Sequence, residues 1–372
     1  MVKALVVGGG IAGIATGLAL SRGGIEVDLV ERDEAIRAIG SGITLIAPAM
    51  RALQRLEVLD ECIENGYGTK EMQICDVNGT VLDVMALPSA LGSDLPGMMG
   101  MMRPMLHQIL LDHAASEGLT VRTGLGPTAI ETNSEHATVT FSDGSIADYD
   151  LVVGADGIRS TVRDIVSAPQ TPVFQEQICY RAVVPRPASV TCEVAFVGCE
   201  TAHIGFSPTG KDSMYIYCCV PTSELYRPPA EELPEIVRGY LAPFGGVVAE
   251  LRDGITDPAQ VNCAPLETIL APEPWYHGRV VLLGDAAHST TPHLAAGAAM
   301  CLEDAVVLAE EFGTAATVPD ALRAYSKRRF ERCKYVVETS TQLSFWQTHP
   351  DVPGADQEGL RGEAFGILAG AY

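Results

Sequence analysis

A glycine-rich turn between two apolar segments near the N-terminus constrains the fold of this chain more than any other feature. Residues 2–7 (VKALVV) have the pattern of a buried parallel strand, and Gly8, Gly10 and Gly13 follow at the head of a helix. In this arrangement Gly8 permits a tight turn, Gly10 lets a pyrophosphate approach the backbone, and Gly13 lets the helix pack closely on the strand. Residues 25–30 (IEVDLV) form the next strand. The pattern predicts a Rossmann-like βαβ unit that binds one dinucleotide.

An acidic residue closes the second of these strands. Glu31 follows Gly13 by 18 positions, where a carboxylate can accept hydrogen bonds from ribose hydroxyls. Ala12 and Arg32 lie beside the same turn and are further candidates for cofactor binding. The glycine motif does not distinguish FAD from NAD, so a plain NAD-dependent dehydrogenase stays open at this point.

Composition restricts the partners and the compartment. The 372 residues include 25 Lys and Arg against 47 Asp and Glu, a formal net charge of −22, which argues against nucleic acid or an anionic membrane as partner. The 10 cysteines form no Cys-x-x-Cys pair and no metal-ligand spacing with histidine, so no metal site is expected, and Cys218 and Cys219 are expected to be buried free thiols. The first strand leaves no room for a secretory signal, and no apolar stretch is long enough to span a bilayer. A cytoplasmic protein is expected.

A second motif follows an apolar segment in the middle of the chain. Residues 149–160 (YDLVVGADGIRS) predict a strand over 151–153 that runs into a turn and then a helix. Asp156 lies within that turn, and its local interpretation is stabilisation of the turn itself.

The third motif is the most specific one. From residue 280 the sequence VVLLGDAAHSTTP predicts a strand, then Gly284 and Asp285, then a loop that contains Pro292. A helix with the acidic pair Glu303 and Asp304 follows.

With these motifs the chain resembles the flavoprotein aromatic hydroxylases of the p-hydroxybenzoate hydroxylase-like superfamily, over nearly its whole length. Within them it is most similar to the salicylate hydroxylase and bacterial FAD-dependent urate hydroxylase branch. The resemblance implies an α/β fold with an α+β insertion, in which a Rossmann-like FAD-binding domain of the GR2 flavoprotein type is interleaved with an antiparallel β-sheet substrate domain. The expected segments are 1–70, 100–170 and 265–330 for the FAD domain, 71–99 and 171–264 for the substrate domain, and 331–372 for a C-terminal helical segment.

The same resemblance assigns roles to individual residues. Asp156 would contact the flavin and nicotinamide pyrophosphates, Asp285 would bond the ribityl chain, and Pro292 would line the substrate side. Arg103 matches an arginine that braces the flavin from a crossing helix. A helix N-terminus would present backbone N–H groups to the flavin ring, and its residues are Gly297, Ala298 and Ala299. The family usually has Gly-Gln-Gly-x-Asn at this loop, whereas this chain has Ala-Ala-Gly-Ala-Ala, so only backbone contacts are expected there.

Short apolar segments between the second and third motifs predict an antiparallel sheet. They cover residues 178–184, 192–197, 202–206 and 213–220. The alternation places Tyr215, Tyr217 and Cys219 on one face of the last strand. The resemblance to the urate hydroxylases makes Tyr215 a candidate for proton relay and His203, which stands where those enzymes have an arginine, a candidate substrate ligand or base.

The implied function is hydroxylation of a small aromatic or heteroaromatic compound through a flavin C4a-hydroperoxide, with FAD as cofactor, NADH or NADPH as transient co-substrate, and O₂. Epoxidation, Baeyer–Villiger oxidation or ring cleavage by the same fold stay open, as does a non-redox protein that keeps FAD as a scaffold. A monomer or homodimer is expected. The basic residues at 323, 327, 328, 329 and 332 are expected to form mostly a solvated helix face, and His107, His113, His277, His288 and His349 are expected to be structural.

Overall fold

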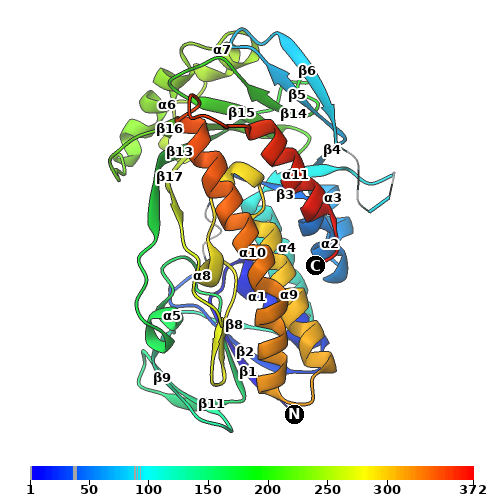
Figure 1. Cartoon of the computed structure of the whole chain (residues 1–372), viewed down its shortest axis with the longest axis vertical. Helices are drawn as coiled ribbons and strands as arrows, with labels where there is room; N and C mark the ends of the chain where they lie inside the picture. The colour runs from blue at the N-terminus through cyan, green and yellow to red at the C-terminus, as the bar shows by residue number, and fades with distance from the viewer. Residues whose placement is uncertain (1, 37–39, 88, 90, 93) are drawn as a thin grey trace.

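The computed structural model describes residues 2–36, 40–87, 89, 91, 92 and 94–372. The molecule is elongated: one end holds a mainly parallel sheet, the other a larger, mainly antiparallel sheet, and the long helix α10 (Val318–Thr348) runs beside both (Figure 1). Among the described residues, no helix combines the length and the apolar character needed to cross a bilayer.

The first sheet has six strands in the order β18-β19-β12-β1-β2-β8. The central strand β1 pairs in parallel with β2 and with β12, and the apolar side chains of β1 and β12 are buried. Such continuous burial is typical of parallel strands covered on both faces. The strands are β1 (Lys3–Val7), β2 (Glu26–Val30), β8 (Val121–Arg122), β12 (Leu151–Gly154), β18 (Tyr276–His277) and β19 (Val280–Leu282).

The second sheet has seven strands in the order β17-β13-β16-β15-β14-β5-β6. All neighbours pair antiparallel except β14 and β5, which are parallel. The four segments predicted to form an antiparallel sheet correspond to β13, β14, β15 and β16, and their antiparallel pairing is confirmed. The parallel pair forms where β5 joins this sheet from an earlier segment. The strands are β5 (Glu71–Cys75), β6 (Val81–Ala86), β13 (Val173–Pro185), β14 (Glu193–Phe196), β15 (His203–Pro208), β16 (Ser213–Pro221) and β17 (Val261–Thr268).

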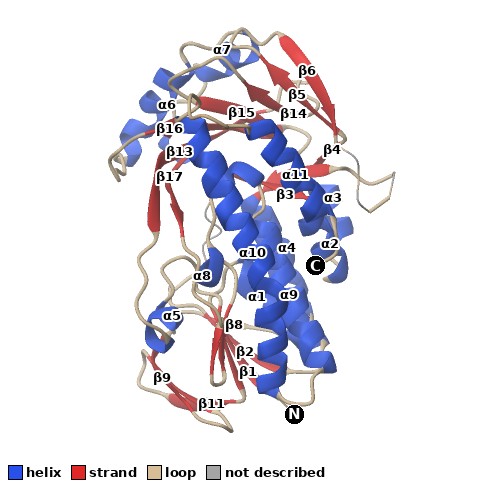
Figure 2. Cartoon of the chain, in the orientation of Figure 1, coloured by secondary structure: helices blue, strands red, loops and turns tan. Residues whose placement is uncertain are grey.

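Two small sheets complete the strands. The antiparallel sheet β3-β7-β4 lies between the two large sheets, where β7 contacts β15 and β3 contacts α9. The hairpin sheet β11-β10-β9 lies at the far end of the molecule, beyond the parallel sheet (Figure 2). Their strands are β3 (Gly42–Ile46), β4 (Tyr67–Thr69), β7 (Met98–Met102), β9 (Pro127–Thr132), β10 (Ala137–Phe141) and β11 (Ile146–Tyr149).

Helices cover the parallel sheet and the outer face of the seven-stranded sheet. α1 packs against α9 and α4, and α9 packs against α10 and α2, which forms the larger core. α6 and α7 cover the outer face of the seven-stranded sheet and form a second core with it (Figure 1). The helices are α1 (Ile11–Arg22), α2 (Ala47–Arg55), α3 (Leu59–Asn65), α4 (Arg103–Ser116), α5 (Thr161–Val166), α6 (Leu233–Leu241), α7 (Gly246–Arg252), α8 (Asp285–His288), α9 (Gly297–Thr314), α10 and α11 (Gln357–Ala369), with 3₁₀ turns η1 (Ala230–Glu232), η2 (Pro258–Gln260) and η3 (Pro292–Leu294).

The mixed α/β fold built on a glycine-turn βαβ unit is confirmed. The division into interleaved domains stays a prediction. Two strands run across its expected limits: β7 between residues 99 and 100, and β17 between residues 264 and 265.

Candidate active site

The glycine turn leaves no room for side chains where the elements meet and open space where a phosphate would approach. Gly8 has φ +116°, and a Cβ there would lie 2.4 Å from the Ala155 carbonyl oxygen. A Cβ at Gly13 would lie 1.8 Å from the Gly8 carbonyl oxygen, whereas a Cβ at Gly10 would meet nothing within 4 Å. Gly10 is the N-cap of α1, so the free N–H groups of that helix open onto this space.

Two side chains hold the turn in place. Glu31 accepts hydrogen bonds from the backbone N–H groups of Gly9 (2.8 Å) and Asp33 (3.0 Å). His107, on α4, contacts the Gly9 carbonyl oxygen through Nε2 at 2.7 Å, so Nε2 carries the proton. Burial lowers the pKa of His107. The ribose contact expected of Glu31 stays a prediction, as does the cofactor role of Arg32, whose side chain is exposed.

The first and third motifs meet directly. Gly284 has φ +59°, and a Cβ there would lie 3.1 Å from both Ala12 Cβ and Cys301 Sγ. The next residue, Asp285, begins α8, and its carboxylate has no hydrogen-bond or ion-pair partner among the described residues. An unpartnered carboxylate beside the glycine turn is free to accept hydrogen bonds from a ligand hydroxyl.

The second motif is tied to the third. Asp156 accepts from the Ser160 hydroxyl (2.5 Å) and from the backbone N–H groups of Thr161 (2.7 Å) and Val162 (3.1 Å), the first two N–H groups of α5, whose N-cap residue is Ser160. Burial raises the pKa of Asp156. The buried Arg163 then donates to the Ala286 carbonyl oxygen over 2.8 Å. These bonds stabilise the turn locally, which is the alternative role weighed for Asp156, and its pyrophosphate contact stays a prediction.

The remaining predicted FAD residues lie around the same space. Gly297, Ala298 and Ala299 form the first turn of α9, which has no acidic residue there to occupy its free N–H groups. Arg103 begins α4 and its side chain lies against Gly40, where a Cβ would be 3.0 Å from Arg103 Cδ. The open space above Gly10, the unpartnered Asp285 carboxylate and the free helix ends together fit a dinucleotide that carries both phosphates and hydroxyls.

A buried ion network fixes the Gly284 loop to α9 and α10. Asp304 accepts from the Gly284 backbone N–H (2.9 Å), contacts His288 Nε2 (2.6 Å), and accepts from Arg329 Nε (2.7 Å). Arg329 also donates to Glu303 over 2.7 Å. Burial alone would raise the pKa of Asp304, but the His288 and Arg329 charges lower it to about 2.

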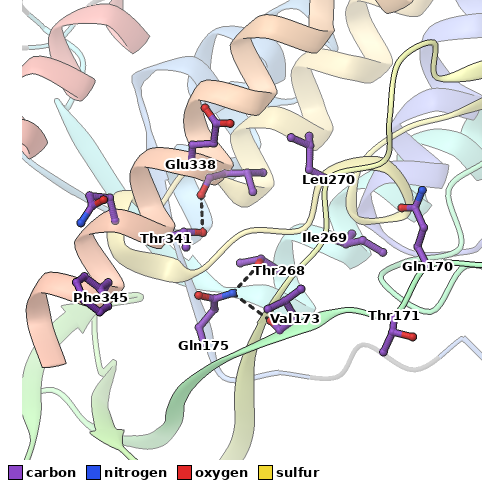
Figure 3. A pocket seen from close by; sticks show the side chains of 12 residues that line it. Gln170, Thr171, Val173, Gln175, Thr268, Ile269, Leu270, Glu338, Thr341 and Phe345 are labelled. Carbon is purple, nitrogen blue, oxygen red and sulfur yellow. Dashed lines mark hydrogen bonds between the residues drawn. The ribbon is translucent and has the colours of Figure 1, made fainter. Parts of the chain in front are cut away.

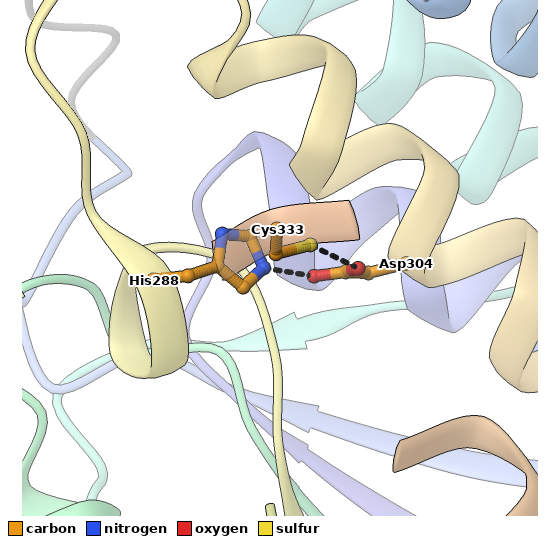
Figure 4. Close-up of side chains that lie close together, drawn as sticks. All are labelled: His288, Asp304 and Cys333. Carbon is orange, nitrogen blue, oxygen red and sulfur yellow. Dashed lines mark hydrogen bonds and ion pairs between the residues drawn. The ribbon is translucent and has the colours of Figure 1, made fainter. Parts of the chain in front are cut away.

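His288, Asp304 and Cys333 place their ligand atoms within 4.8 Å of one another (Figure 4). Both carboxylate oxygens of Asp304 are already occupied, and the Arg329 cation lies beside them. The cluster is therefore explained as part of the ion network rather than as a metal centre.

The prediction of a solvated basic face on α10 is wrong for two residues. Arg329 is fully buried, and Arg332 is largely buried in an ion pair with Glu303 (2.8 Å). The carboxylates that face them come from α9, which a charge pattern along α10 alone cannot reveal.

The seven-stranded sheet has two different faces. Met214, Ile216 and Cys218 point into the core under α6 and α7. Tyr215 and Tyr217 lie on the other face, as predicted from the alternation, and a Cβ at Gly205 would lie 2.2 Å from the Tyr217 hydroxyl. The expected burial of Cys218 and Cys219 as free thiols is confirmed.

Tyr215 is surrounded by polar groups from three strands. Its hydroxyl lies 3.1 Å from Thr44 Oγ1, Thr44 Oγ1 lies 3.2 Å from Ser207 Oγ, and Ser207 donates to Glu193 over 2.8 Å. Burial raises the pKa of Tyr215, which keeps the phenol neutral. Arg181 on β13 shares this face, and no carboxylate forms an ion pair with it in the described part of the chain.

The structure does not bring His203 and Tyr215 together. They lie on neighbouring strands, where His203 pairs with Cys219 while Tyr215 pairs with Ser207, four residues further along. Burial lowers the pKa of His203, whose side chain forms a hydrogen bond with the Gln347 backbone. The catalytic role of His203 stays a prediction.

A second histidine, His293, lies near His203 in the turn after Pro292. It bridges Thr291 Oγ1 and Gln347 Oε1, each at 2.9 Å, and burial lowers its pKa to about 4. Pro292 itself is exposed at the start of η3, and its place beside the substrate stays a prediction.

The sequence patterns did not point to Thr44, Ser207, Arg181 or His293. One available signal was Glu193, a lone acid in the apolar segment CEVAFV.

A groove of about 770 Å³ runs between α10 and the ends of β13 and β17 (Figure 3). Gln175 Nε2 donates there to Thr268 Oγ1 (2.9 Å) and to the Val173 carbonyl oxygen (3.2 Å). Within the described residues, none of the predicted site residues lines this groove. The candidate active site is therefore assigned to the inner face of the seven-stranded sheet and the three motifs.

Comparison with known proteins decides the family. A family model described as an FAD binding domain matches residues 1–340. The chain belongs to this family. Among its relatives are FAD-dependent hydroxylases, so the protein is an FAD-dependent monooxygenase of the aromatic hydroxylase group, and FAD is its cofactor.

Individual relatives cover nearly the whole monooxygenase. It is 35% identical to 2-heptyl-3-hydroxy-4(1H)-quinolone synthase of Pseudomonas aeruginosa, over 92% of this chain and 90% of the relative. It is 28% identical to 6-hydroxynicotinate 3-monooxygenase of Pseudomonas fluorescens, over 93% and 92%. The structure of Klebsiella pneumoniae HpxO complexed with FAD and uric acid superposes with a TM-score of 0.86, at 26% identity over 99% of this chain and 92% of HpxO.

Proposed function

We propose that this monooxygenase hydroxylates a small, electron-rich heteroaromatic compound that carries a hydroxyl or oxo group on its ring, with NADH or NADPH as the reductant. The observation that carries the proposal is the inner face of the seven-stranded sheet, where the buried Tyr215 hydroxyl and the Arg181 cation lie together. Three relatives support the substrate class, because their names specify a quinolone, a hydroxynicotinate and a urate.

The bound FAD would supply reducing equivalents taken from NAD(P)H and would deliver one oxygen atom of O₂ to the ring. The protein's own residues have three tasks. The glycine turn and Asp285 hold the cofactor, and the buried sheet face excludes water. Tyr215 accepts a proton from the substrate hydroxyl as it passes its own phenol proton to Thr44, which enriches the ring in electrons, and Arg181 stabilises the resulting oxyanion.

We infer that the protein works in the cytoplasm, because all ten cysteines are free thiols and a reducing compartment keeps them so.

Anaerobic stopped-flow mixing of the FAD-loaded protein with NADH or NADPH tests the function. A panel of hydroxyquinolines, hydroxypyridines, purines and phenols is added in turn. We expect at least one compound to accelerate flavin bleaching and, in air, to yield a hydroxylated product that carries ¹⁸O from ¹⁸O₂. If no member of the panel changes flavin reduction and no labelled product forms, the proposal is wrong.

A further inference from the structure

Glu193 is an unusual carboxyl group in this molecule. The buried carboxyl side chains of the described residues are Glu193, Glu303 and Asp304, and the last two each form an ion pair with Arg329. Among the described residues Glu193 has no ion-pair partner, and its one hydrogen bond comes from the Ser207 hydroxyl. Burial raises the pKa of Glu193 to about 8. A buried carboxyl without a cation costs stability, so its position calls for an explanation in function.

The hydroxyls next to Glu193 form a chain with a single direction. Ser207 has one hydrogen, and it donates that hydrogen to Glu193 over 2.8 Å. Ser207 must then accept from Thr44 in their 3.2 Å contact. Thr44, whose hydrogen is thereby used, must accept from the Tyr215 hydroxyl at 3.1 Å. The Tyr215 oxygen keeps a lone pair that can accept a hydrogen bond from a substrate.

Close packing of two sheets brings these hydroxyl groups together. β3 and β7 approach β15 and β16 at glycines: a Cβ at Gly42 would lie 2.1 Å from the Tyr215 ring, and a Cβ at Gly100 would lie 2.7 Å from Ser207 Oγ. In the β3–β7 register Thr44 is the partner of Gly100. Thr44 can bridge Tyr215 and Ser207 only because neither glycine carries a side chain.

The charges around Glu193 suit a site that receives a proton. Tyr215 and Tyr217 from β16 face it, and Cys192 is its neighbour on the chain. The described residues of β3 and β7 bring no charged group to it. Arg181 lies at the Tyr215 end and acts on that hydroxyl. The cation is thus at the end where an oxyanion would form, and the carboxylate is at the other end.

We propose that Glu193 is the terminal proton acceptor of a relay that runs from Tyr215 through Thr44 and Ser207. This inference rests on the proposed function. The substrate hydroxyl gives its proton to Tyr215, each hydroxyl passes one proton to the next, and the Glu193 carboxylate receives the last one. The negative charge moves from Glu193 to the substrate oxygen, beside Arg181. Glu193 is a positioning and proton-storing residue, because it does not touch the substrate.

Infrared titration of the FAD-loaded protein without substrate tests the first half of the relay. We expect the carbonyl band of a protonated carboxylic acid to disappear as the pH rises through about 8 and to be missing in Glu193→Gln. Thr44→Val should shift the midpoint of this titration, because it removes the hydroxyl that links Tyr215 to Ser207. A band that survives in Glu193→Gln, or no band at all, overturns the proposal.

The pH profile of product formation tests the second half, with the panel compound that gives the most product. The wild-type rate should rise up to a pH of about 8, whereas Glu193→Gln and Ser207→Ala should have flat profiles and be slower by roughly tenfold or more. Flavin reduction should be unchanged in both. Ser213→Ala, on the same strand as Tyr215 but outside the relay, is the matched control and should keep the wild-type profile.

The outcomes separate the two proposals. If a compound is hydroxylated and Glu193→Gln keeps the wild-type profile, the relay is wrong while the proposed function stands. If no compound is hydroxylated, the proposed function fails and the relay fails with it.

Discussion

Replacement of Asp304 by Asn should destabilise the protein strongly, because it removes one charge from the buried network that holds the Gly284 loop. The Asp304 side chain is fully buried and interacts with Gly284, His288 and Arg329 at 2.6 to 2.9 Å. Removing one partner of a buried ion pair costs about 3–5 kcal/mol. Arg329 keeps its pair with Glu303, so we expect the low end, about 3 kcal/mol.

Urea denaturation of the wild type and Asp304→Asn gives this difference as a change in the free energy of unfolding. Glu338→Gln is the matched control, since Glu338 lies on α10 in an exposed pair with Lys334 and its loss should leave stability unchanged. Asp304→Asn should also bind FAD roughly tenfold more weakly, because the Gly284 N–H loses a charged acceptor. A free energy of unfolding within about 0.5 kcal/mol of wild type would refute the reasoning.

The pH dependence has a definite sign. The pKa of Asp304 is lowered from 3.8 to about 2, so its contribution is present above 3.8 and is lost as the pH falls towards 2. The pKa of His288 is raised well above 6.5: burial opposes this, but Cys333 and Asp304 outweigh it. Its contribution is therefore full below 6.5 and is lost at higher pH as His288 deprotonates. The gap between wild type and Asp304→Asn should be widest between about pH 4 and 6.5.

Further predictions concern the sheet face. Burial raises the pKa of Glu193 from 4.5 to about 8, so wild-type stability should fall relative to Glu193→Gln by about 3–4 kcal/mol between pH 5 and 8; an equal difference in the free energy of unfolding at the two pH values would contradict this. Arg181→Ala should raise the KM of a hydroxylated heteroaromatic substrate roughly tenfold or more, measured by NAD(P)H oxidation, with Arg323→Ala on the exposed face of α10 as control. Gly42→Ala should displace the Tyr215 ring and abolish coupled turnover while flavin binding persists, as shown by the ratio of product to NAD(P)H consumed. Tyr215→Phe should lower that same ratio more than it slows flavin reduction, and an unchanged ratio would count against proton transfer at Tyr215.

The FAD-binding half could be predicted from the sequence because its signals are local. Gly8, Gly10 and Gly13 directly follow one strand. Their spacing indicates where the backbone turns tightly, where a pyrophosphate approaches it, and where the helix packs on the strand. Gly284 and Asp285 follow another strand in the same way. The structure adds that Ala12 and Gly284 touch, which neither motif specifies alone.

The substrate side could be predicted only in part, because its residues meet through packing between distant segments. Alternation along β16 correctly placed Tyr215 on the inner face. Nothing local relates Thr44, Ser207 and Glu193, which come from three strands and meet because Gly42 and Gly100 let two sheets approach. Arg329 was predicted to be exposed for the same reason, because its ion-pair partners Glu303 and Asp304 lie on another helix, α9.

The flavin content of the purified protein tests the central claim most directly, since the claim is that three separated motifs enclose one dinucleotide. After denaturation, the released flavin is identified by chromatography and counted against the protein by absorbance. We expect about one FAD per chain, and Asp285→Ala should retain clearly less. A colourless protein that also takes up no added FAD would contradict the account.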